Sequence, residues 1–205
     1  MIGIGPAGMA RLGAVVERTA RTFLITGGVR SGKSTYAERL AESLGAAVSY
    51  VATGPQPSAD DPEWAARVAD HRARRPSDWT TIESLDLGSV LDSATGTVLI
   101  DCFGTWTTAV IDELDGWDAP TADWKPEFDD RLQAVVSAWQ SCDRPIVAVS
   151  NEVGWGVVPA YRSGRIFADL LGEVNRTIAA ISDQLVLMVA GRPMIVPAPA
   201  GRIDQ

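Results

Sequence analysis

Short continuous runs of apolar residues alternate in this chain with longer stretches in which apolar residues recur at helical spacing. Apolar runs of this length are typical of strands buried on both faces of a sheet. We expect strands at residues 22–26, 47–53, 79–82, 98–101, 146–150 and 185–189. We expect helices at residues 33–44, 62–74, 127–140 and 162–181, a polar loop at 54–61, and a mobile insertion at the polar, proline-containing segment 117–126.

This order of elements predicts the fold class. Strands that alternate with amphipathic helices form an α/β fold, with a mostly parallel sheet and helices on both faces. A length of 205 residues suits one domain. We therefore expect a single catalytic domain at residues 21–205, after a flexible leader at residues 1–20.

The leader contains Gly3, Gly5 and Gly8 in the spacing of a dinucleotide-binding fingerprint. That fingerprint requires a preceding strand, which we do not expect here, so we assign the segment no ligand. Its charged residues follow the apolar stretch, the reverse of the order in a secretory signal. Because no apolar run reaches the roughly 18 residues of a membrane span, we expect a cytoplasmic protein without membrane insertion.

Composition excludes several function classes. The 26 acidic residues outnumber the 18 basic residues, and the formal net charge of −8 opposes binding to a nucleic-acid backbone. His71, Cys102 and Cys142 are too widely spaced for a zinc ribbon or finger. Two lone cysteines also provide no disulfide framework. The only lysines are Lys33 and Lys125, so the position of each lysine is informative.

Segment 27–34, with the sequence GGVRSGKS, fits the phosphate-loop pattern G-x-x-x-x-G-K-[ST]. Its glycines allow successive backbone N–H groups to face phosphate oxygens, and the following helix adds its positive end. A chain of this composition contains about 0.002 such matches by chance. We therefore expect a P-loop NTPase-type fold, in which Lys33 reaches the β- and γ-phosphates and Ser34 binds Mg²⁺.

The strand at residues 98–101 ends in Asp101, a second candidate ligand for Mg²⁺. A carboxylate at the end of a strand near a phosphate loop can hold or orient the ion. The alternative is an aspartate that caps a turn. The phosphate loop in the same chain favours the role in metal binding.

The single histidine lies among arginines. On a helix, Arg67, Arg74 and Arg75 share the face of His71. Three cations disfavour protonation of an imidazole, so we expect a neutral side chain that can attack an α-phosphate and form a phosphoramidate. This stretch alone leaves two alternatives open. One is a solvated basic helix with an idle histidine, and the other is a set of arginines that clamp phosphates in a simple kinase.

Several motifs resemble a known family, the bifunctional adenosylcobinamide kinase/adenosylcobinamide-phosphate guanylyltransferases. They are GGVRSGKS (27–34), YVAT (50–53), the histidine- and arginine-containing segment 61–83, LIDCFGTW (99–106), SNEVGWGVVP (150–159) and VAGRP (189–193). The resemblance extends from residue 22 to about residue 196. Gly104 departs from the family, in which a larger apolar residue is common at this position.

The resemblance implies two reactions late in cobalamin assembly. ATP or GTP phosphorylates adenosylcobinamide, and GTP then gives GMP to adenosylcobinamide phosphate through a GMP–histidine intermediate, with release of pyrophosphate. The guanylylated histidine of the family matches His71, which joins Lys33 as an expected catalytic residue. The nucleotide-binding positions correspond to Gly27, Gly28, Val29, Arg30, Ser31, Gly32, Lys33, Ser34, Ala52, Thr53, Gly54, Arg72, Ala73, Arg74, Arg75, Glu83 and Asp101. The family also implies a homo-oligomer, with a trimer suggested.

Two other function classes stay open at this stage. A monofunctional P-loop kinase for a small molecule would use the loop, Asp101 and the arginines but would assign no role to His71. A regulatory protein that uses nucleotide hydrolysis as a switch would bind nucleotide without modifying an acceptor. Covalent labelling of the protein by GTP labelled at the α-phosphate distinguishes the guanylyltransferase from both.

Overall fold

The computed structural model describes residues 19–45 and 47–198. The elements in this part of the chain are β1 (Thr22–Gly27), α2 (Lys33–Ser43), β2 (Val48–Ala52), α3 (Pro62–Arg74), β3 (Thr80–Glu83), α4 (Leu87–Ser93), β4 (Thr97–Asp101), α5 (Phe103–Glu113), α6 (Thr121–Ser141), β5 (Ile146–Val149), α7 (Arg162–Ile181), β6 (Gln184–Val189) and β7 (Arg192–Val196). The predicted leader lies almost entirely outside the described residues. The division into a leader and one domain therefore stays a prediction.

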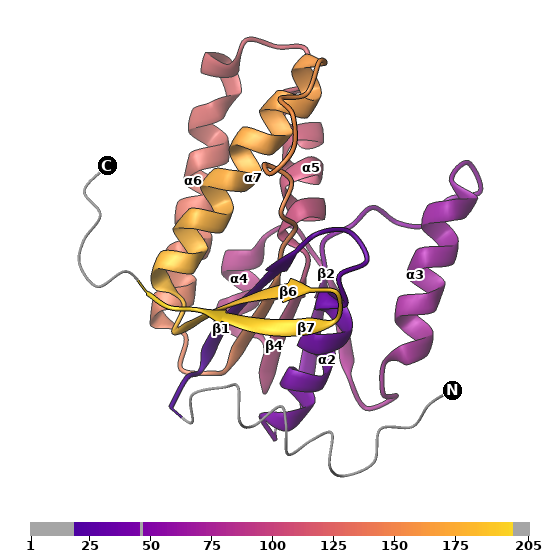
Figure 1. Cartoon of the computed structure of the whole chain (residues 1–205), viewed down its shortest axis with the longest axis vertical. Helices are drawn as coiled ribbons and strands as arrows, with labels where there is room; N and C mark the ends of the chain where they lie inside the picture. The colour runs from indigo at the N-terminus through magenta and orange to yellow at the C-terminus, as the bar shows by residue number, and fades with distance from the viewer. Residues whose placement is uncertain (1–18, 46, 199–205) are drawn as a thin grey trace.

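The described strands form one sheet in the order β3-β2-β4-β5-β1-β6-β7 (Figure 1). Neighbouring strands are parallel throughout, except that β7 runs antiparallel to β6. The predicted mostly parallel α/β fold is confirmed. Because parallel strands end on the same edge of the sheet, the carboxyl ends of β1, β5, β4 and β2 meet along one edge.

Hydrophobic cores cover both faces of the sheet, as predicted. Helix α2 packs on one face, and helices α4 to α7 pack on the other. The larger core contains the fully buried Trp106 and Trp139 on α5 and α6. Helix α3 contributes no residue to either core and stands beside the sheet, next to α2 (Figure 1).

The prediction of a mobile insertion at residues 117–126 is wrong. Helix α6 begins at Thr121 and contains Pro126. The apolar spacing seen from residue 127 onward in fact starts earlier, because Trp124 is only 4% exposed and its ring lies against Phe128 with 6.4 Å between centroids. Burial of these two rings outweighs the one helical hydrogen bond that a proline cannot donate.

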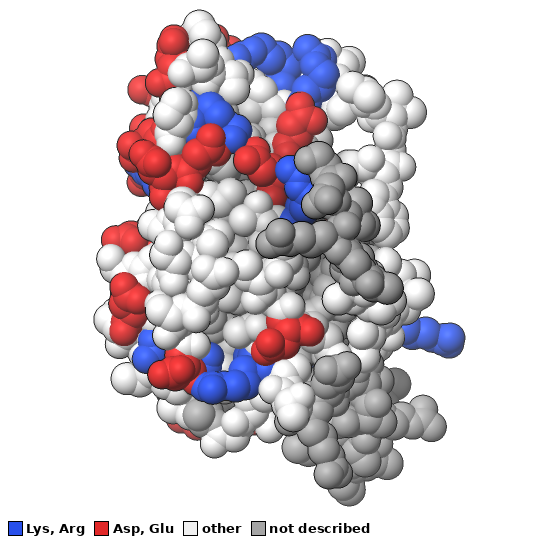
Figure 2. Space-filling model, turned by 90° about the vertical axis from the view of Figure 1, so that its left-hand side faces the viewer, with Lys and Arg blue, Asp and Glu red and all other residues white. Residues whose placement is uncertain are grey.

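Charged side chains are mixed on the molecular surface. Figure 2 shows acidic and basic residues interleaved on one face of the molecule, without a continuous basic area on that face. No helix among the described residues is both long and apolar enough to cross a lipid bilayer.

Candidate active site

The predicted phosphate loop connects β1 to α2 and lies at the carboxyl edge of the sheet. Gly32, the residue before α2, has a φ of +91°, which glycine adopts at little steric cost. At Gly27, a Cβ atom would lie 2.7 Å from the backbone carbonyl oxygen of Met188. The side chain of Lys33 folds back over the loop, and its Nζ donates a hydrogen bond to the carbonyl oxygen of Gly28 at 3.2 Å. The path of the backbone therefore requires glycine at positions 27 and 32.

Asp101 lies opposite the phosphate loop, at the end of β4. The parallel pairing of β4 with β2 places it beside Ala52. Ser34 Oγ donates to Asp101 Oδ1 at 3.5 Å, and Tyr50 Oη donates to Asp101 Oδ2 at 2.9 Å. The structure thus brings together the two side chains predicted to hold Mg²⁺. Hydroxyl and carboxylate oxygens are ligands that suit this ion.

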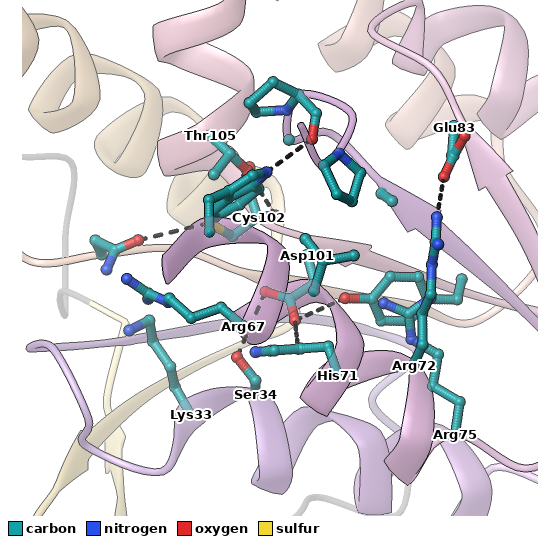
Figure 3. A pocket seen from close by; sticks show the side chains of 18 residues that line it. Lys33, Ser34, Arg67, His71, Arg72, Arg75, Glu83, Asp101, Cys102 and Thr105 are labelled. Carbon is teal, nitrogen blue, oxygen red and sulfur yellow. Dashed lines mark hydrogen bonds and ion pairs between the residues drawn. The ribbon is translucent and has the colours of Figure 1, made fainter. Parts of the chain in front are cut away.

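Helix α3 carries His71 to the same edge of the sheet. Asp61 caps the helix by accepting a hydrogen bond from the backbone N–H of Trp64 at 2.9 Å. The indole of Trp64 donates to the carbonyl oxygen of Pro55 at 2.8 Å and fills the space that a Cβ on Gly54 would need. These contacts anchor the start of α3 on the loop after β2, so that His71 faces Asp101 two turns further on (Figure 3).

The imidazole of His71 faces two carboxylates. Its Nδ1 lies 3.5 Å from Asp101 Oδ2 and 4.0 Å from Glu38 Oε1. Burial lowers the pKa of His71 most strongly, and the nearby charges of Arg74 and Arg75 lower it further, whereas Asp101 and Glu38 raise it. The imidazole is therefore neutral at pH 7, as predicted. The main cause is burial rather than the arginines.

The arginines near His71 lie in different surroundings. Arg67 lines the cavity between α3 and the phosphate loop. Burial is the largest cause of the lowered pKa of Lys33, and the charge of Arg67 lowers this pKa further. Arg72 pairs with Glu83 at 2.8 Å. Arg75 follows the end of the helix, and its guanidinium lies 3.3 Å from the centroid of the Tyr50 ring. Arg74 pairs with Glu38 at 3.2 Å. Arg67, Arg74 and Arg75, the three cations expected on the face of His71, therefore have different partners.

A cavity lies between α2, α3 and the ends of β2 and β4 (Figure 3). The predicted residues that line it are Lys33, Ser34, Ala52, Gly54, His71, Arg72, Arg75, Glu83 and Asp101. The predicted residues outside the lining are Gly27, Gly28, Val29, Arg30, Ser31, Gly32, Thr53, Ala73 and Arg74. Thr53 is buried beneath the cavity, Ala73 is exposed on α3, and Arg74 pairs with Glu38.

The structure adds residues that sequence reasoning missed. Tyr50, Trp64, Cys102, Thr105 and Asn151 also line the cavity. Glu38 follows Ser34 by one helical turn on α2, and Tyr50 precedes Ala52 by two residues on β2. These spacings place each pair on a shared face, a signal that could have identified Glu38 and Tyr50.

A hydrogen-bonded group forms the floor of the cavity. Thr53 Oγ1 donates to the backbone carbonyl oxygen of Cys102 at 2.7 Å and lies 2.7 Å from Thr105 Oγ1. Burial raises the pKa of the Cys102 thiol, so the thiol stays protonated and can donate to Asn151 Oδ1 at 3.5 Å. This Asn151 oxygen lies 2.7 Å from the place of a Cβ on Gly104. Gly104, which departs from the family pattern, thus leaves the space that Asn151 occupies.

The fold and the site together define a P-loop nucleotide-binding protein. A similar fold is found in an ATPase from the type III secretion system of pathogenic bacteria, with a TM-score of 0.57 and 14% identity, over 87% of this chain and 54% of that chain. The model of the cobinamide kinase / cobinamide phosphate guanyltransferase family matches residues 23–196. The chain belongs to this family and is an enzyme.

Individual members of the family are similar over most of their length. The bifunctional adenosylcobalamin biosynthesis protein CobU of Salmonella typhimurium is 39% identical over 179 residues, which cover 82% of this chain and 96% of that protein. CobP of Pseudomonas aeruginosa, described in the same words, is 39% identical over 83% of this chain and 94% of its own. CobU of Escherichia coli is 36% identical over 82% of this chain and 96% of its own.

Proposed function

We propose that this enzyme phosphorylates adenosylcobinamide with ATP or GTP and then transfers GMP from GTP to the adenosylcobinamide phosphate. The product of the second reaction is adenosylcobinamide-GDP, and the leaving group is pyrophosphate. One observation carries the proposal. His71, the single histidine of the chain, lines the same cavity as Lys33 and Ser34 of the phosphate loop. A nucleotide bound on the phosphate loop would therefore lie in the same cavity as the imidazole of His71.

In the first reaction, the hydroxyl oxygen of the aminopropanol arm attacks the γ-phosphorus. The bond from this phosphorus to the β-phosphate oxygen breaks, the nucleoside diphosphate leaves, and the hydroxyl proton is released. Lys33 neutralises charge on the β- and γ-phosphates, and the N–H groups of residues 28–32 hold their oxygens. Ser34 and Asp101 would hold Mg²⁺, which supplies charge neutralisation on the phosphates when bound.

In the second reaction, the neutral imidazole of His71 attacks the α-phosphorus of GTP. A phosphorus–nitrogen bond forms, and the bond to pyrophosphate breaks. A phosphate oxygen of adenosylcobinamide phosphate then attacks the same phosphorus and displaces His71, which returns to its starting state. Arg67, Arg72 and Arg75 line the cavity and supply positive charge for the phosphates.

Mass spectrometry of the intact protein tests the covalent step. After incubation with GTP and Mg²⁺, one GMP per chain is expected, attached within residues 67–74, labile in acid and stable in alkali. His71→Asn is expected to lose both the adduct and guanylyl transfer, while phosphorylation of adenosylcobinamide persists. An absent adduct, or an adduct undiminished in His71→Asn, would favour the monofunctional kinase instead.

We also infer a cytoplasmic homo-oligomer, with a trimer as the expected state. The loop between β5 and α7 exposes apolar side chains, with Trp155 74% and Val157 96% exposed. Such residues either pack against another subunit or contact the large corrin ring. Sedimentation and the KM for adenosylcobinamide, both measured on Trp155→Ala, separate the two roles. Loss of the oligomer indicates a subunit contact, and a raised KM with an intact oligomer indicates the corrin.

A further inference from the structure

The two carboxylate oxygens of Asp101 face different partners. Oδ1 accepts a hydrogen bond from Ser34 on α2, at 3.5 Å. Oδ2 accepts one from Tyr50 on β2, at 2.9 Å, and lies 3.5 Å from Nδ1 of His71 on α3. One side chain thus connects the phosphate loop through one oxygen and the histidine through the other (Figure 3).

The hydroxyl of Tyr50 is held rigidly. The residue is 2% exposed, in the middle of β2. Its ring lies under the guanidinium of Arg75, at 3.3 Å, and is stacked with Trp79, at 6.4 Å between centroids. Because an ionised carboxylate can only accept hydrogen bonds, the hydroxyl donates to Asp101 and fixes the direction of Oδ2.

The position of Oδ2 decides which nitrogen of His71 can react. A negative charge beside Nδ1 favours the tautomer in which Nδ1 carries the proton. Glu38 Oε1, at 4.0 Å from Nδ1, favours the same tautomer. The lone pair then belongs to Nε2, which can attack phosphorus, and the positive charge that forms on the ring lies against the carboxylate.

We propose that Tyr50 is a positioning residue for guanylyl transfer, acting on His71 through Asp101. This inference rests on the proposed function, since it concerns the attack of His71 on the α-phosphorus of GTP. In that step the Nε2–phosphorus bond forms, the bond to pyrophosphate breaks, and the proton on Nδ1 stays beside Asp101 Oδ2. In the kinase reaction, the hydrogen bond from Ser34 still holds Oδ1 of Asp101 when the Tyr50 hydroxyl is absent, so this reaction should lose less than guanylyl transfer.

Tyr50→Phe tests this role, because it keeps the ring under Arg75 and removes only the hydroxyl. Loss of an outer-shell hydrogen bond to a metal ligand typically costs about 10- to 100-fold, and the Tyr50 hydroxyl makes a bond of this kind to Asp101. We expect the single-turnover rate constant for the GMP adduct to fall by about tenfold or more, with an unchanged GTP concentration for half-maximal rate. Phosphorylation of adenosylcobinamide should fall by a smaller factor, because Ser34 still orients Asp101.

Tyr36→Phe is the matched control. Tyr36 is also buried, and its hydroxyl has no hydrogen-bond partner among the described residues. Its removal should change neither the adduct rate nor the kinase rate. An adduct rate unchanged in Tyr50→Phe would overturn the proposal. Equal losses of both activities, together with a lower Tm, would also overturn it, because they indicate a purely structural role.

NMR spectroscopy determines the tautomer of His71 in the absence of any reaction. Since His71 is the only histidine, the ¹⁵N-imidazole NMR spectrum of untagged protein reports on this residue alone. The wild type should carry its proton on Nδ1, and Tyr50→Phe should gain population of the form protonated on Nε2. A wild type protonated on Nε2 would contradict the proposal. A wild type with the expected tautomer but no GMP adduct would instead contradict the proposed function.

Discussion

Arg74 forms an ion pair with Glu38, with 3.2 Å between Arg74 Nη2 and Glu38 Oε1. The same Glu38 oxygen lies 4.0 Å from Nδ1 of His71. Arg74 therefore acts on His71 in two ways: its own charge lowers the pKa of the imidazole, and it partly neutralises a carboxylate that raises this pKa. Both effects keep the imidazole in the neutral form that can attack phosphorus.

The pH dependence of the adduct rate follows from this arrangement. Protonation removes the lone pair, so the rate constant for GMP attachment should fall as the pH decreases through the lowered pKa of His71, below the ordinary value of 6.5. Arg74→Gln removes a cation and exposes the charge of Glu38, which raises this pKa. The acidic limb of the rate profile should therefore move to higher pH.

Arg131→Gln is a suitable control for this shift. Arg131, on α6, also pairs with acidic side chains, at 2.5 Å from Glu113 and 3.2 Å from Glu127. Its removal breaks an arginine–glutamate network away from the cavity and should leave the pH profile in place. An acidic limb that stays fixed in Arg74→Gln, or moves to lower pH, would contradict the electrostatic account of His71.

Replacement of Lys33 by alanine should abolish the kinase activity and preserve the fold. The Lys33 ammonium is buried and donates to the carbonyl oxygen of Gly28 alone among the described residues. Burial lowers the pKa of Lys33, because the charged ammonium loses hydration inside the protein. The negative charge of bound phosphates would compensate for this loss. We expect the phosphorylation rate to fall by about 100-fold or more. Near-normal phosphorylation with a normal Tm would show that the loop does not bind the β- and γ-phosphates.

Replacement of Ser34 by alanine should change the dependence on Mg²⁺. Ser34 Oγ and Asp101 Oδ1 lie 3.5 Å apart and are the two oxygens proposed for the ion. Loss of one ligand should raise the Mg²⁺ concentration for half-maximal kinase rate by about tenfold. Ser43→Ala should not change this titration, since within the described part of the chain its hydroxyl bonds only to the Leu40 carbonyl oxygen, at the other end of α2. An identical titration for both variants would exclude Ser34 as a ligand.

The sequence predicted the parts of the fold that depend on local pattern. The strands at the centre of the sheet are continuous apolar runs, and helix α7 has apolar residues at regular spacing, so both were predicted. Helix α4 has only seven residues and β7 is mostly exposed, so neither has a clear period, and both were missed. Helix α5 was also missed, although Phe103, Trp106 and Val110 recur in it at helical spacing. Segment 117–126 was misjudged because its polar composition concealed Trp124, whose burial depends on a partner in the next helical turn.

The candidate site could be predicted only where one short segment contains the signal. The phosphate loop lies within eight consecutive residues, and Asp101 ends an obvious strand. The spacing of Glu38 from Ser34 and of Tyr50 from Ala52 indicates a shared face within α2 and within β2. That these side chains meet His71 and Asp101 depends on the packing of α2, β2, β4 and α3, which the sequence pattern does not show. For the same reason, the sequence does not show the burial that lowers the pKa of His71. The prediction therefore attributed too much of the neutral state of His71 to the charges of the arginines.

Gly104 and Asn151 provide a final prediction. A Cβ on Gly104 would lie 2.7 Å from Asn151 Oδ1, and Asn151 lines the cavity beside the phosphate loop. Gly104→Ala should therefore move the Asn151 side chain. Gly104 is the second residue of α5, so the gain in helix propensity from alanine is smaller than the roughly 1 kcal/mol of a helix interior and offsets only part of the crowding. We expect a Tm close to that of the wild type and a kcat/KM for phosphorylation lowered by about tenfold.

A double-mutant cycle shows whether Asn151 carries this effect. In an Asn151→Ala background the clash is absent, so Gly104→Ala should cause almost no further loss of kcat/KM. Gly88→Ala is the control, since a Cβ on Gly88, also in a helix, would meet Ala134 at an ordinary 3.5 Å. If the losses caused by Gly104→Ala and Asn151→Ala simply add, the glycine acts on the reaction by a route other than Asn151. If they do not add, the space left by Gly104 is what allows Asn151 to face the nucleotide cavity.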